Sequence, residues 1–218
     1  MPPIIIYWYY METYNKAIII KKLQDSPHIL FTTHILRQYT DLKSPATLHR
    51  LVNDLVASKI LGKLERGKYY INDTRVDDFT KATIFYTPSY ISFESALNHH
   101  GILSQFPYET TSATPKKSKS KVIGDKLYSY TRIKKSLFWG YVKEGNYLIA
   151  EPEKALLDQL YLNSKGLKGQ SIDEYDYERL SLSRFWQYSK LFPQTIKFKK
   201  LLSQVKLELN NPHHYDVI

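Results

Sequence analysis

The chain has 218 residues, of which 43% are hydrophobic, so it can bury a substantial core in one or two domains. Its formal net charge of +10 at pH 7 favours an acidic partner such as a nucleic acid or an anionic surface. With no cysteine, the sequence excludes disulfide bonds, thiolate zinc sites and cysteine nucleophiles. This composition is typical of an intracellular protein.

The chain opens with an apolar run from Ile4 to Tyr10, which is too short to span a bilayer. No Lys or Arg precedes it, as would be expected of a secretory signal. We therefore expect a cytoplasmic protein with no membrane partner. Because Met11 follows directly, two interpretations of the first ten residues stay open: a misassigned translation start, or an extra packing strand.

The first third of the chain predicts three short helices. Residues 14–24 alternate apolar residues with lysines, and Ser26-Pro27 ends this helix. A second helix follows Thr32-Thr33, whose hydroxyls can cap its first amides. A third begins at Ser44-Pro45, an N-cap followed by a proline at the first helical position. Its buried stripe has three- and four-residue spacings and consists of Leu48, Leu51, Val52, Leu55 and Val56.

A β-hairpin is expected after the third helix. Residues 62–71 form two strand-like arms around a Glu65-Arg66-Gly67 turn. Three helices and a hairpin in this order predict a winged helix-turn-helix DNA-binding domain, to which we assign residues 11–76. The polar, acidic segment from Asp73 to Asp78 predicts the linker to a second domain, residues 77–218.

The second domain mixes strands with helices. The pattern predicts a helix at 89–99, strands at 110–113, 127–132 and 147–150, a strong helix at 152–163, and two helices within 181–209 that are broken at Phe192-Pro193. We therefore expect a fold of the α/β (α+β) class. A winged helix-turn-helix would be followed by a mixed α/β domain with a helical C-terminal end.

The outward face of the third helix is the candidate DNA-reading surface. Residues on the N-terminal half of such a helix reach base edges, and the candidates here are Ala46, His49, Arg50 and Asn53. Arg50 can pair with guanine and Asn53 with adenine. The candidate phosphate and wing contacts are Thr32, Thr33, Lys43, Ser44, Thr47, Arg66 and Lys68. The competing interpretation is a small helical bundle with an ordinary solvated face.

The basic excess of the chain lies mostly in residues 81–150, outside the expected DNA-binding domain. Its most concentrated part is a low-complexity segment, residues 115–121, which we expect to be a loop. The cations are Lys116, Lys117, Lys119 and Lys121. Two interpretations stay open: a loop that contacts phosphates without sequence preference, or a solvated loop.

Two stretches resemble a known family, the AbiEi-type antitoxins. The segment from Ser44 to Val52, with the Arg66 to Ile71 hairpin, resembles the N-terminal winged helix of that family. The segment from Pro88 to Ile102, followed by the segment from Ile149 to Asp158, looks like the paired signature of its second domain. The resemblance covers residues 31–162.

The resemblance implies a transcriptional autorepressor that binds inverted repeats in its own promoter. It also implies an antitoxin of a type IV toxin–antitoxin system that counteracts a nucleotidyltransferase-like toxin. In such systems the antitoxin need not form a stable complex with the toxin. No catalytic activity, cofactor or metal is expected.

Two motifs invite a metal site but have simpler explanations. Glu151, Glu153 and Asp158 do not follow a ligand spacing that we recognise, and good helix-starting chemistry accounts for them. Adjacent helical residues such as His99 and His100 point about 100° apart, so one metal cannot easily use both. We expect one packed and one exposed histidine.

Two further functions compete with a repressor. One is a nuclease or nucleotidyltransferase with a DNA-targeting module, although the sequence has no Gly-rich phosphate loop, nucleophile elbow or metal-ligand cluster. The other is a transcriptional regulator whose second domain senses a small molecule.

Overall fold

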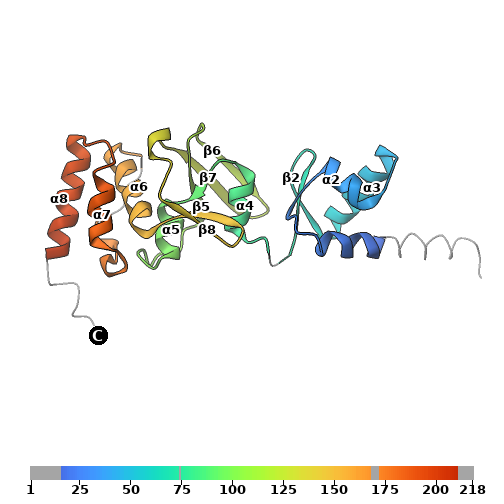
Figure 1. Cartoon of the computed structure of the whole chain (residues 1–218), viewed down its shortest axis with the longest axis horizontal. Coiled ribbons are helices and arrows are strands. Elements are labelled where there is room, and N and C mark those ends of the chain that lie inside the picture. Colours follow the sequence, from blue (N-terminus) through green and yellow to red (C-terminus); the bar gives the residue numbers. More distant parts are fainter. Residues whose placement is uncertain (1–15, 74, 168–171, 211–218) are drawn as a thin grey trace, which may run out of the picture. The chain divides into compact units, whose positions relative to one another are not determined.

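The computed structural model describes residues 16–73, 75–167 and 172–210 (Figure 1). The chain divides into two compact units, Met1–Asp77 and Asp78–Ile218. Each unit has its own core, so each is described by itself. The chain as a whole belongs to the mixed α/β class.

The first unit combines helices with a small sheet. Helical residues 16–24 precede β1 (Leu30–Thr32), α2 (Thr33–Thr40), α3 (Pro45–Ala57), β2 (Leu61–Glu65) and β3 (Lys68–Ile71). The strands form an antiparallel sheet in the order β1-β3-β2. The core under this sheet is apolar and includes Leu23, Phe31, Leu36, Leu48, Val52, Leu55, Leu61, Leu64 and Ile71.

Polar contacts hold both ends of the expected linker, from Asp73 to Asp78. The Arg75 guanidinium lies 2.7 Å from the Asp73 carboxylate and donates to the Ser26 carbonyl at 2.6 Å. This guanidinium lowers the pKa of Asp73. Asp78 begins α4 (Asp78–Phe85) in the second unit and pairs with Lys126 at 2.8 Å.

The second unit is built on a six-stranded sheet in the order β6-β7-β5-β4-β9-β8. Its strands are β4 (Tyr90–Ile91), β5 (Glu109–Thr114), β6 (Lys119–Ile123), β7 (Lys126–Arg132), β8 (Tyr141–Glu144) and β9 (Tyr147–Ala150). The β5–β7 and β4–β9 pairs are parallel and the other pairs are antiparallel. The strands expected at 110–113, 127–132 and 147–150 are confirmed.

Helices cover both faces of this sheet. On one face, Tyr130 donates its hydroxyl to the carbonyl of Ala82 in α4 at 2.7 Å. On the other, the Thr111 hydroxyl accepts the amide of Ser95 in α5 (Phe93–His99) at 3.1 Å. Helix α6 (Pro152–Ser164) is buried on almost all sides and packs against α5, α7 (Leu182–Ser189) and α8 (Ile196–Asn210).

Two expectations for the second unit need correction. The helix expected from Ser89 begins only at Phe93, because Tyr90 and Ile91 are used as β4 between β5 and β9. The segment expected to be a loop at 115–121 ends in a strand, because Lys119 and Lys121 belong to β6. Helix α4 and strands β1 and β8 were not anticipated.

Candidate nucleic-acid interface

Helix α3 carries the base-reading candidates and is positioned by its own sequence. The Ser44 hydroxyl accepts the amide of Thr47 at 3.4 Å, and Pro45 takes the first helical position. Leu48, Val52 and Leu55 are buried at three- and four-residue spacings, which fixes one side of the helix against the core. The opposite side is therefore left to solvent.

All four base-reading candidates lie on this exposed side of α3: Ala46, His49, Arg50 and Asn53. The Asn53 amide nitrogen lies 3.2 Å from Nδ1 of His49, one turn earlier. As the amide nitrogen can only donate, Nδ1 accepts and the ring proton lies on Nε2 in the neutral form. Asn53 keeps its carbonyl oxygen and one N–H, which is the pair that an adenine edge requires.

The candidate phosphate contacts at the start of α3 are also exposed. Lys43, Ser44 and Thr47 surround the first turn, where backbone amides have no helical partner. The Ser44 hydroxyl already accepts one of these amides, but its own hydrogen is available to an oxygen ligand. This end of α3 is therefore chemically suited to an anion.

Thr32 and Thr33 are occupied by structural contacts. The Thr32 hydroxyl accepts the Ile35 amide at 3.2 Å and caps α2. Thr33 donates its backbone amide to the Gly67 carbonyl at 3.0 Å, and its hydroxyl points to the same oxygen at 3.4 Å. Thr32 therefore caps α2 and Thr33 fastens the start of α2 to the hairpin turn, which limits what either can offer to a phosphate.

The hairpin between β2 and β3 turns through Arg66 and Gly67. Gly67 has a φ of 75°, a left-handed conformation that favours glycine. Arg66 is exposed, whereas the Lys68 ammonium lies 2.6 Å from the Glu65 carboxylate. Lys68 is therefore partly neutralised, and Arg66 is the stronger of the two predicted cations at this turn.

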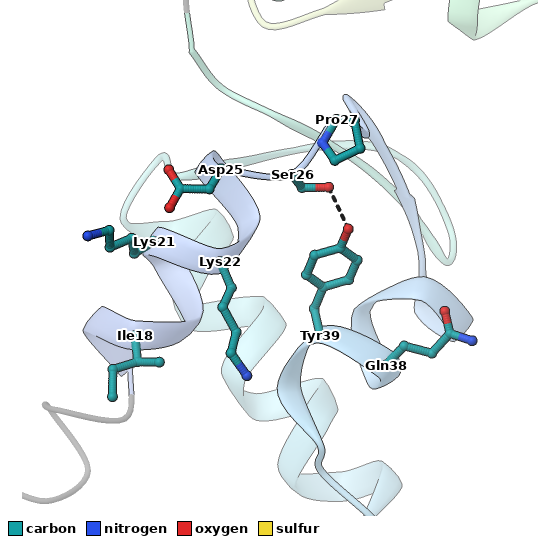
Figure 2. Close-up of a pocket in the computed structure, with 8 residues that line it drawn as sticks. All are labelled: Ile18, Lys21, Lys22, Asp25, Ser26, Pro27, Gln38 and Tyr39. Atoms are coloured by element: carbon teal, nitrogen blue, oxygen red, sulfur yellow. Dashed lines mark hydrogen bonds between the residues drawn. The ribbon is translucent and has the colours of Figure 1, made fainter.

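A groove of about 570 Å³ lies beside α2 in the same unit (Figure 2). Its walls come from helical residues 16–24, the turn that follows them, and α2. The Ser26 and Tyr39 hydroxyls are 2.7 Å apart and join two of these walls. The groove is lined by Ile18, Lys21, Lys22, Asp25, Ser26, Pro27, Gln38 and Tyr39.

The basic segment of the second unit is more ordered than expected. Lys119 and Lys121 pair across from Tyr130 and Tyr128 of β7, so they lie on the face of the sheet that α4 covers. The Lys119 ammonium lies 5.4 Å from the ring centroid of Tyr86, directly after α4, and the Lys121 ammonium lies 4.9 Å from that of Phe85, the last residue of α4. Cation–π contact and strand pairing explain why these lysines are not in a loop.

Lys116 and Lys117 lie in the connection before β6 and are exposed. Lys116 donates its ammonium to the Thr87 carbonyl at 2.6 Å and lies over the Tyr86 ring. The Tyr86 hydroxyl donates to the Lys117 carbonyl at 3.0 Å. Four lysines are therefore gathered on the edge strand β6 and in the connection just before it.

A buried polar cluster lies where the two second-domain stretches of the sequence meet, and we define it as Tyr90, Ser92, Lys154 and Asp158. Lys154 and Asp158 form an ion pair with both side chains fully buried. One Asp158 oxygen also accepts the hydroxyls of Tyr90 at 2.8 Å and Ser92 at 2.9 Å. Lys154 donates to the Tyr90 oxygen at 2.8 Å.

Burial and charge act on the cluster in opposite directions. Burial lowers the pKa of the Lys154 ammonium, although the Asp158 carboxylate opposes this effect. Burial and the same carboxylate raise the pKa of Tyr90 well above its usual value, so the phenol stays protonated and can donate. Gly140 approaches the Lys154 stem so closely that a Cβ there would lie 3.0 Å from Cγ. The cluster is tightly enclosed.

The alternative of a carboxylate metal site gains no support from these contacts. Asp158 is paired with Lys154, and Glu153 accepts the Ser181 amide at 2.8 Å. Within residues 16–73, 75–167 and 172–210, no group of three or more His, Asp or Glu side chains is placed to hold a metal ion. His100 bonds to the Ala150 carbonyl at 2.7 Å, and His99 contacts Glu144.

The sequence interpretation missed the buried cluster. The strongest sequence signal for this cluster is a Lys and an Asp four residues apart, with Ala155, Leu156 and Leu157 between them. In such an apolar helix a charged side chain can be buried only with a partner. The partners Tyr90 and Ser92 come from a stretch more than 60 residues away in the chain. Only the tertiary structure brings them together.

None of the helices in the described part of the chain is both long and apolar enough to cross a membrane. Comparison of the chain with protein-family models and with curated protein sequences found no match.

Proposed function

We propose that this chain is a sequence-specific, double-stranded-DNA-binding transcriptional autorepressor whose first unit acts as a winged helix-turn-helix. One observation carries the proposal: Ala46, His49, Arg50 and Asn53 form one exposed stripe that runs from the first turn of α3 to just past its middle, opposite a buried apolar stripe. This is the part of a recognition helix that enters the major groove.

The order of elements supports this assignment. A helix, β1, α2, α3 and the β2–β3 hairpin follow one another, and β1 pairs with β3. In this arrangement α2 and α3 act as the helix-turn-helix and the hairpin acts as the wing. Asp54 lies one turn after Arg50 and directly after Asn53, and its negative charge ends the proposed DNA-facing stripe at Asn53.

The contacts divide into two classes. Arg50 can donate two hydrogen bonds to guanine, and Asn53 can pair with adenine. Lys43, Ser44, Thr47 and Arg66 would hold phosphates and fix the register without reading sequence. The lysines beside β6 would add salt-sensitive affinity if a flanking phosphate reaches them.

The antitoxin role is proposed on the family resemblance alone. On this proposal the cytoplasmic protein binds inverted repeats in its own promoter, which requires two copies on the operator. It counteracts a nucleotidyltransferase-like toxin, with or without a stable complex. Co-expression with such a toxin from the neighbouring reading frame should restore growth. If no such frame adjoins the gene, the antitoxin proposal fails and the DNA-binding proposal stands.

Gel-shift assays on the promoter fragment test DNA reading directly. Arg50→Ala and Asn53→Ala should each cost about 1–3 kcal/mol, roughly a 5- to 160-fold loss of affinity for the cognate site. Lys43→Ala should weaken binding to all sequences and lower the salt slope by about 1. The matched control is Arg179→Ala, which removes an exposed arginine from the second unit.

Unchanged cognate affinity in both the Arg50 and Asn53 variants would refute the placement of the reading face. Equal losses on cognate and random DNA would instead assign these side chains to backbone contact. Circular dichroism of each variant separates a lost contact from a lost fold.

A second candidate function is a ligand-responsive regulator, which the groove beside α2 favours. Its volume of about 570 Å³ falls within the range of small-molecule sites. It lies in the first unit, so a ligand there would act on the same unit that carries α3. A thermal-shift screen of metabolites, repeated with Tyr39→Ala, tests it. Two results together would support this function: a metabolite raises the melting temperature of the protein but not of Tyr39→Ala, and the same metabolite weakens the affinity of the protein for its operator.

A further inference from the structure

Two large aromatic side chains of the second unit are almost completely exposed. Phe106 and Tyr108 keep 89% and 86% of their accessible surface, although most aromatic residues of this unit are packed in its core. They lie two residues apart in the connection between α5 and β5. Exposed aromatic pairs of this kind are typical of surfaces that bind a partner.

This aromatic loop, residues 105–109, is fixed at both ends by side chains of α5. The Asn98 amide nitrogen donates to the Gln105 carbonyl at 3.2 Å. The Ser95 hydroxyl donates to the Glu109 carbonyl at 3.2 Å. Pro107 restricts the backbone between the two rings. The backbone that carries the exposed rings is therefore held at both ends, which lowers the entropy that the loop loses on binding.

The loop borders a pocket of about 280 Å³. Phe106 and Tyr108 line it together with two acids, Glu94 and Glu109, and with the Thr111 side of β5. Gln159 donates its side-chain amide to Glu94 at 3.1 Å. Glu109 forms no ion pair with any side chain in the described part of the chain.

Aromatic faces and carboxylates together select a cation. A guanidinium or ammonium group is attracted to the ring face and to the carboxylate, whereas an anion such as phosphate is repelled. The pocket is acidic in a chain with a formal charge of +10, so it differs from the basic surfaces proposed to contact DNA. Its chemistry therefore fits a basic protein side chain.

We propose that the aromatic loop and its pocket are a docking site for an arginine or lysine side chain of a protein partner. The cation lies against the Phe106 and Tyr108 rings and within reach of the Glu109 carboxylate. This site goes beyond the proposed function and does not depend on DNA binding, since none of its residues belongs to the first unit.

Titration of the full chain with N-acetyl-arginine amide, followed by amide NMR shifts, tests the site. The matched probe is N-acetyl-citrulline amide, which has nearly the same shape and no charge. We expect saturable shifts at residues 105–109 with the arginine probe, with a Kd on the order of 1–10 mM. The citrulline probe should give no saturable shift.

Phe106→Ala and Tyr108→Ala should each weaken the arginine probe about two- to fivefold, and Glu109→Gln should do the same. Both aromatic substitutions are at exposed positions and should leave the fold intact. The control is Ile196→Ala, because this side chain is 88% exposed but lies at the start of α8. It should leave the Kd unchanged.

Three results would overturn the proposal. These are the absence of saturable shifts at the loop, equal binding of the citrulline probe, and an unchanged Kd in both aromatic variants. A fourth such result would come from sedimentation of the protein without any probe, which measures self-association. Self-association that disappears in Phe106→Ala would assign the loop to a contact between copies of this chain rather than to a separate partner.

Discussion

Removal of the Lys154 ammonium tests how the buried polar cluster stabilises the second unit. Lys154→Met keeps most of the stem that packs beside Gly140 but leaves the fully buried Asp158 carboxylate without its cation. Asp158→Leu does the reverse and leaves a buried ammonium against the aromatic rings of Tyr90 and Trp139. The double variant removes both charges.

The magnitudes follow from what each variant leaves unpaired. Loss of one partner of a buried ion pair costs about 3–5 kcal/mol, so two independent losses would cost about 6–10 kcal/mol. In the double variant no charge stays buried, but the Tyr90 and Ser92 hydroxyls lose their shared acceptor. At about 1–3 kcal/mol for each hydroxyl, the double variant should cost about 2–6 kcal/mol. We therefore expect it to be less destabilised than the sum of the single variants.

Urea unfolding measured by tryptophan fluorescence is the appropriate assay. The ring centroid of Trp139 lies 5.2 Å from the Lys154 ammonium, and Trp186 lies in α7, so both tryptophans report on the second unit. Costs below about 1 kcal/mol for both single variants, or a double variant equal to their sum, would refute the reasoning. If neither single variant folds, a double variant that folds still demonstrates the coupling.

Three further predictions concern local structure and are tested by denaturation. Gly62→Ala should cost about 1–3 kcal/mol because a Cβ there would lie 1.9 Å from the Tyr70 ring; an unchanged free energy of unfolding would contradict this. Ser44→Ala removes a long capping bond of 3.4 Å and should cost about 0.5–1 kcal/mol in the first unit alone. Burial lowers the pKa of His100 below 6.5, so the unfolded chain binds a proton at this histidine more readily than the folded chain does. The stability that the neutral histidine contributes is therefore complete above pH 6.5 and is lost as the pH falls to the pKa of the folded state. His100→Asn should flatten this dependence of the free energy of unfolding on pH.

The sequence predicted best those elements whose local chemistry and tertiary environment agree. Helix α3 has a serine cap, a proline at its first position and a single apolar stripe, and the structure contains it from Pro45 to Ala57. Strand β9 was predicted at its observed bounds, Tyr147–Ala150. For such elements, local preference and burial point to the same structure.

The elements that were missed depend on contacts distant in sequence. Strand β1 has three residues and exists because Phe31 pairs with Tyr69 of β3. Strand β4 has two residues, which periodicity cannot distinguish from the helix that follows. In β6, Lys119 and Lys121 alternate with Ser120 and Val122, which is typical of a strand. The basic, low-complexity composition of residues 115–121 instead favoured the interpretation as a loop. The exposure of Phe106 and Tyr108 could not be predicted, because aromatic residues are usually buried.

The bonds from Thr33 to the Gly67 carbonyl have a consequence for how related sequences can vary. They fix the backbone of the hairpin turn through residues other than Arg66, so the side chain at position 66 can change without moving the turn. Related sequences can therefore vary at position 66 while they keep a hydroxyl residue at 33 and glycine at 67. On the proposed function, substitution at position 66 alone would then change the affinity for phosphate without disturbing the turn.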